Sequence, residues 1–270
     1  MTQEALPEGA EAETTGGERL ISDGKVMSIW DHLSELRGRL VRSALAVVVF
    51  FGIALAFSQQ IILFLRQPLQ DALPPGADVL HFTNPLDVFM IDLKVGFLVG
   101  IVASAPVWIY QFWKFFEPAL YPRERRYVLP FIVASAGLFF VGIAFCYFVI
   151  LPSSLDFLIG MGREVGTPMI TIRDYVSLLF LMIFSFGLVF EAPVIIVLLA
   201  FLDILSLEGL KAARRYVVVG TIIVSAFMAP PDPVSQVAMS VPLYGMYEVS
   251  ILLIRLLKRK KKTTTETDAP

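Results

Sequence analysis

Long apolar segments, separated by short polar or charged stretches, run along most of the chain. The four longest are Ser43 to Leu65, Val95 to Trp113, Tyr127 to Leu155, and Tyr175 to Leu202, which only Glu191 interrupts. Each approaches or exceeds the ~20 residues that a helix needs to cross a bilayer. Two shorter apolar segments follow, Tyr216 to Pro231 and Val234 to Tyr247. The pattern predicts an all-α polytopic membrane protein with six transmembrane helices, of which the last two are short.

The fifth apolar segment is too short for an ordinary membrane span. Its core, Val217 to Met228, would be about 18 Å long as a helix, whereas the hydrocarbon core of a bilayer is about 30 Å thick. We expect it to form a short hairpin with the sixth segment through residues 229–233. Local thinning of the bilayer is the expected accommodation.

Composition and charge support a membrane protein and predict its orientation. Of the 270 residues, 56% are hydrophobic and 17% charged, whereas a soluble domain carries about 25% charged residues. With six helices, one side of the membrane receives Arg37, Arg39, Arg42, Lys114, Arg123, Arg125, Arg126, Lys211, Arg214, Arg215 and the basic residues from Arg255 to Lys262, and the other side receives Arg66, Arg163 and Arg173. Because basic residues accumulate on the cytoplasmic side, both termini are predicted to lie in the cytoplasm.

The two ends of the chain differ from the membrane region. Residues 1–26 are rich in Glu, Gly and Thr, which predicts a disordered acidic tail, and no apolar core for a cleaved signal peptide occurs there. Residues 27–257 form the predicted membrane domain. Residues 258–270 form a basic and polar tail, which either binds anionic lipid headgroups or acts only as a topology signal.

Motifs for common enzyme and metal chemistry do not occur. Cys146 is the only cysteine, and His32 and His81 are the only histidines, so the sequence offers no cysteine metal site and no multi-histidine site. It contains no GxxxxGK[ST] loop and no GxSxG motif. We therefore expect no enzyme activity, no cofactor, no metal and no nucleic-acid partner. Two similar halves, which are common in secondary transporters, are also not visible.

Glu191 stands in an otherwise apolar segment. An ionisable group at the middle of a bilayer costs about 2.5–3.5 kcal/mol on insertion scales, so it is a functional hypothesis by default. Pro193 follows two residues later and predicts a bend at the acid. Acid and bend together suggest a hydrated notch. The alternative is a packing role through a hydrogen bond to a neighbouring helix.

Two polar stretches on the predicted cytoplasmic side contain further candidate acids. Residues 29–40 carry an apolar stripe at helical spacing, with Glu35 on the other flank, which predicts an interfacial helix that either binds a ligand or only anchors the chain. In the loop of residues 113–126, Glu124 either faces a ligand or is neutralised by the arginines beside it. On the opposite side, Asp87, Asp92 and Lys94 are predicted to form a polar turn before the second helix.

Four motifs together carry a resemblance to a known family. They are His32-Leu-Ser-Glu-Leu-Arg-Gly-Arg-Leu40, Phe116-Glu-Pro-Ala-Leu-Tyr-Pro-Arg-Glu-Arg-Arg126, Phe186-Gly-Leu-Val-Phe-Glu-Ala-Pro193 and Pro230-Pro-Asp-Pro-Val-Ser-Gln236. In this order and at these distances, they closely resemble TatC, the large subunit of the twin-arginine protein translocase. The resemblance covers about residues 27–257.

The resemblance implies a cup-shaped receptor for the signal peptides of folded proteins that bear paired arginines. It also implies TatA-like and TatB-like single-span partners, use of the proton-motive force, a location in the cytoplasmic (inner) membrane, and a homo-oligomer or multi-copy complex. The family's signal-peptide contacts fall on Glu35 and Glu124, with Arg37 and Phe115 nearby. A guanidinium donates two parallel hydrogen bonds to a carboxylate, so two arginines call for two acids.

Other positions match the family with structural alternatives. Pro68 matches a functionally sensitive external proline, although it is also typical of a helix terminator. Asp232 and Gln236 match the place where family members seat a partner helix, although Asp232 could instead cap the sixth helix. Relatives often have a threonine where this chain has Ala229. The family match places Glu191 on the concave side. The alternative functions are a proton-coupled small-solute transporter that uses Glu191, and a membrane scaffold.

Overall fold

The computed structural model describes residues 20–22, 25–27, 29–73, 81, 84–117, 128–162, 170–228 and 233–267. Side chains are described between residues 33 and 256, except in the same gaps and at residue 234. Nearly all of these residues are helical, as the sequence predicts. The helices are α1 Ile29–Ala56, α2 Ser58–Leu65, α3 Gln67–Ala72, α4 Pro85–Ala103, α5 Ala105–Phe116, α6 Val128–Phe145, a π-helical segment Cys146–Ile150, α7 Leu151–Gly162, α8 Ile172–Val189, α9 Ala192–Phe201, α10 Leu207–Met228 and α11 Pro233–Thr267. Strands β1 (Leu20–Ser22) and β2 (Lys25–Met27) form an antiparallel pair.

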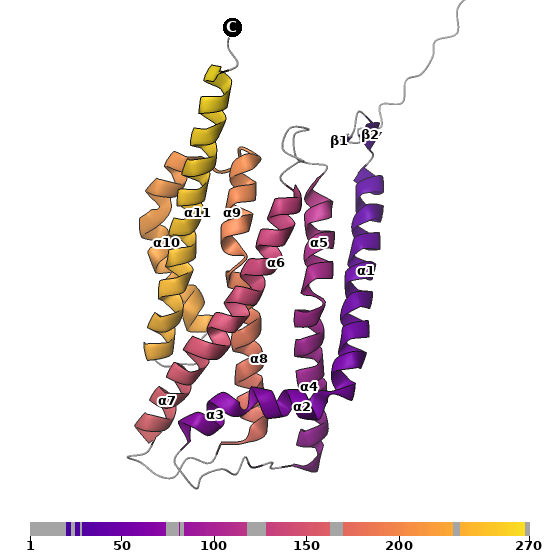
Figure 1. Cartoon of the computed structure of the whole chain (residues 1–270), viewed down its shortest axis with the longest axis vertical. Helices are drawn as coiled ribbons and strands as arrows, with labels where there is room; N and C mark the ends of the chain where they lie inside the picture. The colour runs from indigo at the N-terminus through magenta and orange to yellow at the C-terminus, as the bar shows by residue number, and fades with distance from the viewer. Residues whose placement is uncertain are drawn as a thin grey trace, which may run out of the picture.

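The helices stand side by side, with α1 at one edge and the α10–α11 pair at the other (Figure 1). The N-terminal end of α1 and the C-terminal end of α11 lie at the same end of the bundle, called here the terminal end (Figure 1). The far end holds the beginnings of α4 and α8. The disorder predicted for residues 1–26 concerns mostly residues outside those described, and β1 and β2 are the part of this tail that the structure describes.

Four helical segments of the described chain are long and apolar enough to cross a membrane: Leu33–Ala56, Val128–Gly162, Ile172–Phe201 and Ser235–Leu256. The α4–α5 pair makes a fifth span if the two bent helices count as one. Helix α10, which contains the core of the fifth apolar segment of the sequence prediction, is not among these spans. Helix α11 continues from the sixth apolar segment to Thr267 and is longer than the short last helix that the sequence predicts. The arrangement is thus consistent with six spans.

The bend between α4 and α5 measures 52° and falls at Ser104. Pro106, in the first turn of α5, has no amide proton and its ring clashes with the preceding turn, so the helix cannot run on straight. The Ile101 carbonyl instead accepts from the Ser104 hydroxyl and the Trp108 indole, both at 3.1 Å. Backbone polarity within the apolar region is therefore satisfied by side chains.

The first apolar segment does not remain in one helix to Leu65, contrary to the sequence prediction. Helix α1 ends at Ala56, and α2 and α3 run across the far end of the bundle (Figure 1). Carbonyls in the last turn of a helix lack helical partners. Those of Phe64 and Leu65 accept the hydroxyls of Tyr147 at 2.7 Å and Tyr175 at 2.5 Å. These two bonds hold α2 against the π-helical segment and α8.

Helices α6 and α8 approach closely at two glycines. A Cβ atom on Gly142 would lie 2.7 Å from the Phe186 carbonyl oxygen, and one on Gly187 would lie 2.7 Å from the Phe139 ring. Helices in lipid associate by van der Waals packing rather than by the hydrophobic effect, and small residues permit close contact. Phe139 is fully buried as a result. The crossing therefore depends on these glycines.

Gly142→Ala is expected to lower the melting temperature in detergent. A methyl group there meets backbone, which cannot move aside, and overpacking of this kind costs about 1–3 kcal/mol. Gly137→Ala is the matched control, because it lies on the same helix with nothing within 4 Å of the added Cβ. It should leave stability unchanged or raise it slightly. Equal melting temperatures for the two variants would contradict the close approach.

Candidate functional site

Glu35 lies in the second turn of α1, at the terminal end of the bundle. Its Oε1 accepts from a terminal nitrogen of Arg39, one helical turn later. The two side chains are 29% and 13% exposed, so both are partly covered although they lie near a helix end. The arrangement leaves the predicted signal-contacting acid in an ion pair within its own helix. Arg37 lies between them in sequence but is exposed.

Phe115 lies in the last turn of α5, which packs against α1. Its ring meets Phe116 edge-on at 5.3 Å, and Lys114 beside it pairs with Glu117 at 2.6 Å. The end of α5 and the beginning of α1 both lie at the terminal end (Figure 1). The fold thus brings the helix ends that carry Glu35 and Phe115 to one end of the bundle. Glu124 lies outside the described residues.

Glu191 occupies the interruption between α8 and α9. The proline expected to bend this helix, Pro193, is in the first turn of α9. The regular helix is interrupted at Phe190 and Glu191, although both residues keep right-handed helical dihedrals. The carboxylate is buried, 7% exposed, and Oε2 accepts from the Ser135 hydroxyl of α6. Its other oxygen has no partner among the described residues. The geometry matches the hydrogen bond to a neighbouring helix that was the alternative to an open, hydrated notch.

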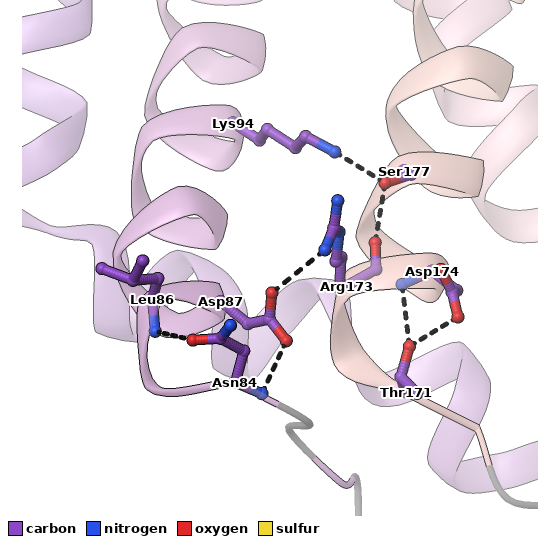
Figure 2. Close-up of polar contacts among 8 residues, drawn as sticks. All are labelled: Asn84, Leu86, Asp87, Lys94, Thr171, Arg173, Asp174 and Ser177. Carbon is purple, nitrogen blue, oxygen red and sulfur yellow. Dashed lines mark hydrogen bonds and ion pairs between the residues drawn. The ribbon is translucent and has the colours of Figure 1, made fainter.

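The far end carries a network of polar contacts between α4 and α8 (Figure 2). The Asp87 carboxylate accepts from the backbone amide of Asn84 at 3.0 Å. This bond completes a capping box, in which the Asn84 side chain accepts from the α4 backbone. Arg173 of α8 reaches Asp87 at 3.4 Å. Lys94 donates to Ser177 at 2.8 Å. Residues 85–94 therefore belong to α4 rather than to a turn, because the capping box starts the helix earlier than its apolar run.

The remaining predicted positions are distributed over the bundle. Pro68 is buried in the first turn of α3, three residues after α2 ends at Leu65. It therefore lies at the start of one helix as well as after the end of another. Proline suits this position because the first amides of a helix have no helical partner. Gln236, near the start of α11, donates to the Ile222 carbonyl of α10 at 3.4 Å. Asp232 lies outside the described residues.

Sequence reasoning missed two buried serine contacts between helices in the described part of the chain. Ser135 reaches Glu191, and Ser235 of α11 donates to Ser154 of α7 at 2.7 Å, with both serines buried. A buried hydroxyl in an apolar helix needs a partner, so isolated serines in these runs are a usable signal. The partner of each serine cannot be found without the packing.

The described residues thus define a polytopic helical membrane protein with polar groups at both ends and one buried acid between them. Residues 31–242 match the model of the family described as Sec-independent protein translocase protein (TatC). The proteins of that name from Desulforapulum autotrophicum and Escherichia coli (strain K12) are each 37% identical to this chain. Those matches cover 88% of this chain and 88% of the first relative, and 87% of this chain and 91% of the second.

A solved structure, described as the crystal structure of the twin-arginine translocase receptor TatC in DDM, superposes with a TM-score of 0.75 at 35% identity. The match covers 82% of this chain and 98% of that one. The chain belongs to the TatC family, which confirms the resemblance seen in the four motifs. Members of this family are membrane components of a protein translocase, and the comparisons give no support to the small-solute transporter.

Asp87→Ala is expected to lower the melting temperature in detergent, with a free-energy cost of about 1 kcal/mol from the loss of the cap. Arg173 adds little to this figure, because its side chain is 61% exposed and the pair is screened by solvent. Asp92→Ala removes the same charge from the same helix and serves as the control. A loss of equal size in both variants would show that charge, and not the cap, matters.

Proposed function

We propose that this chain is the signal-peptide receptor and core subunit of a twin-arginine translocase, which exports folded proteins across the cytoplasmic membrane with the proton-motive force. The observation that carries the proposal is the position of Glu35, a partly exposed acid at the terminal end beside the end of α5. Its support is the family membership and the similarity to a structure described as a twin-arginine translocase receptor.

Recognition rests on two acids and two guanidinium groups. Glu35 and Glu124 each receive one arginine of the signal peptide, and Phe115 and Arg37 border the site. A guanidinium forms two parallel hydrogen bonds with a carboxylate, whereas an ammonium group is a point charge without this planar fork. The site therefore distinguishes arginine from lysine although the two side chains carry equal charge.

The receptor lies in the inner membrane with both termini in the cytoplasm. Both described ends of the helical region lie at the terminal end, which supports an even number of spans (Figure 1). This end also carries Arg37, Arg42 and the basic residues that follow Arg255, as expected for the cytoplasmic side. The basic tail of residues 258–270 then lies beside anionic headgroups of the same leaflet.

Partner subunits of TatA and TatB type bind along the short hairpin and near the buried acid. Gln236 supplies a polar group where α10 and α11 meet, and several apolar side chains on α10 are exposed, among them Phe227 at 82%. Asp232, which lies outside the described residues, is the second proposed polar contact. Glu191 contributes an intramembrane polar group that meets a partner helix during transport. Pro68 fixes the external crossing segment. The working form is a multi-copy complex.

Glu35→Gln and Glu124→Gln are each expected to weaken binding of a twin-arginine precursor by about ten- to a hundredfold. This range follows from a loss of about 1.5–3 kcal/mol for a hydrogen bond to a charged group. Site-specific crosslinking to a radiolabelled signal peptide, titrated with precursor, measures the change. A twin-lysine precursor should bind the unmodified protein with a similar deficit.

Glu208→Gln is the control for this experiment, because Glu208 is exposed at the start of α10 and its loss changes the net charge equally. It should bind the precursor normally. Unchanged binding by both the Glu35→Gln and the Glu124→Gln variant would overturn the assignment of the site.

Glu191→Gln is expected to retain export, whereas Glu191→Leu should lose most of it. Glutamine can still accept from Ser135 through its amide oxygen and remains polar towards a partner helix, but leucine can do neither. Export of a folded reporter into the periplasm, compared at equal levels of membrane protein, is the measurement. An inactive but stably folded Glu191→Gln protein would show that ionisation of this residue is required.

A further inference from the structure

The pairing of Glu35 with Arg39 has a consequence for signal recognition. The carboxylate that the proposed function assigns to a signal arginine already holds an arginine of its own helix. We propose that Arg39 is a resident competitor, so that signal binding at Glu35 exchanges one guanidinium for another and the receptor's affinity is held down. This inference rests on the proposed function, and it adds a residue that tunes that function without being a ligand contact.

The position of Arg39 favours a lasting contact over a passing surface pair. Glu35, Arg39 and Ser43 recur one turn apart, and this partly covered stripe differs from the exposed residues beside it, such as Arg42. Helix α1 packs on α4 and α5 through its covered side. Arg39 is the more buried partner, at 13% exposure against 29% for Glu35. Its side chain is therefore held beside the acid by packing as well as by charge.

The geometry of the ion pair leaves room for exchange. One terminal nitrogen of Arg39 meets one oxygen of Glu35, and the Arg39 Nε is buried without a partner among the described residues. The resident guanidinium thus does not make the bidentate pair of two parallel bonds that an arginine can form with a carboxylate. An incoming arginine that makes both bonds has the better geometry, and it can displace the resident group.

Competition of this kind predicts a specific pattern of affinities. Every ligand that binds Glu35 must first break the same ion pair with Arg39, so removal of Arg39 should strengthen binding of arginine and lysine signals by a similar factor. The ratio between the two stays set by the fork geometry of the ligand. A structural role for Arg39, in which it orients Glu35 for the signal, predicts the opposite sign, because removal would then weaken binding.

The test compares equilibrium binding of twin-arginine and twin-lysine signal peptides to the purified full-length protein in detergent, at low and high salt. Arg39→Gln should tighten binding of both peptides by about two- to fivefold at low salt, with an unchanged ratio. This is the upper part of the range for surface ion pairs, because the pair is partly covered. Weaker or unchanged binding overturns the proposal. Arg42→Gln removes the same charge from an exposed position of α1. An equal tightening in that variant would assign the effect to general surface charge and overturn it as well.

A Glu35→Gln background separates failure of this inference from failure of the proposed function. If the exchange is correct, Arg39→Gln has no further effect once the acid is gone. If the Glu35→Gln protein binds the signal peptides normally, the site itself is misassigned. If it binds them poorly while Arg39→Gln alone does not tighten binding, the site is correct and only the exchange with Arg39 is wrong. If the Arg39→Gln protein does not fold, Arg39→Lys replaces it. This variant should bind both peptides more tightly by a smaller factor, and unchanged binding would overturn the proposal.

Discussion

Hydrocarbon offers no hydrogen-bond partner to a peptide group, and the architecture of this protein depends on how that constraint is met. Unbroken helices satisfy it without side chains. Two of the breaks in the described helices, at Ser104 and at Phe190–Glu191, each precede a proline in the first turn of the next helix. At the first break, hydroxyl and indole donors bind the Ile101 carbonyl. At the second, the Glu191 carbonyl accepts from the Val194 and Ile195 amides.

The same constraint explains why polar side chains occur where they do. A break or an end of a helix leaves backbone groups without helical partners, so polar side chains there have groups to bind. Glu191 is held by the Ser135 hydroxyl of a neighbouring helix, and tyrosine hydroxyls close the last turn of α2. An acid in this position is therefore compatible with a stable bundle.

Much of the fold could be predicted from the chain alone, because apolar run lengths and prolines report directly on membrane helices. The interruption at Glu191 follows from Pro193, and the short apolar part of α10 follows from the brief apolar core after Arg215. The turn of α2 across the far end could not be predicted, since it depends on Tyr147 and Tyr175, which lie far away in sequence. The early start of α4 depends on a capping box that an apolar count does not include.

The candidate site was less accessible to sequence reasoning than the fold. Glu35 could be identified from its motif, but its pairing with Arg39 depends on which face of α1 is covered by α4 and α5. Helical spacing makes Arg39 a neighbour of Glu35, but only the packing of α1 decides how far the pair is covered. The surroundings of Glu35 are thus shaped by the same interhelical contacts that build the bundle. Mutations in α5 can consequently alter the acid without touching it.

The π-helical segment Cys146–Ile150 has its own consequence for the bundle. A π turn accommodates one residue more than an α turn, and this extra residue rotates everything after it by about 100° around the helix axis. Helix α7 therefore presents a different face from the one that an uninterrupted α6 would present. Ser154 lies on the face that meets Ser235 of α11. The π-helical segment thereby sets which face of α7 meets α11 at the C-terminal edge of the bundle.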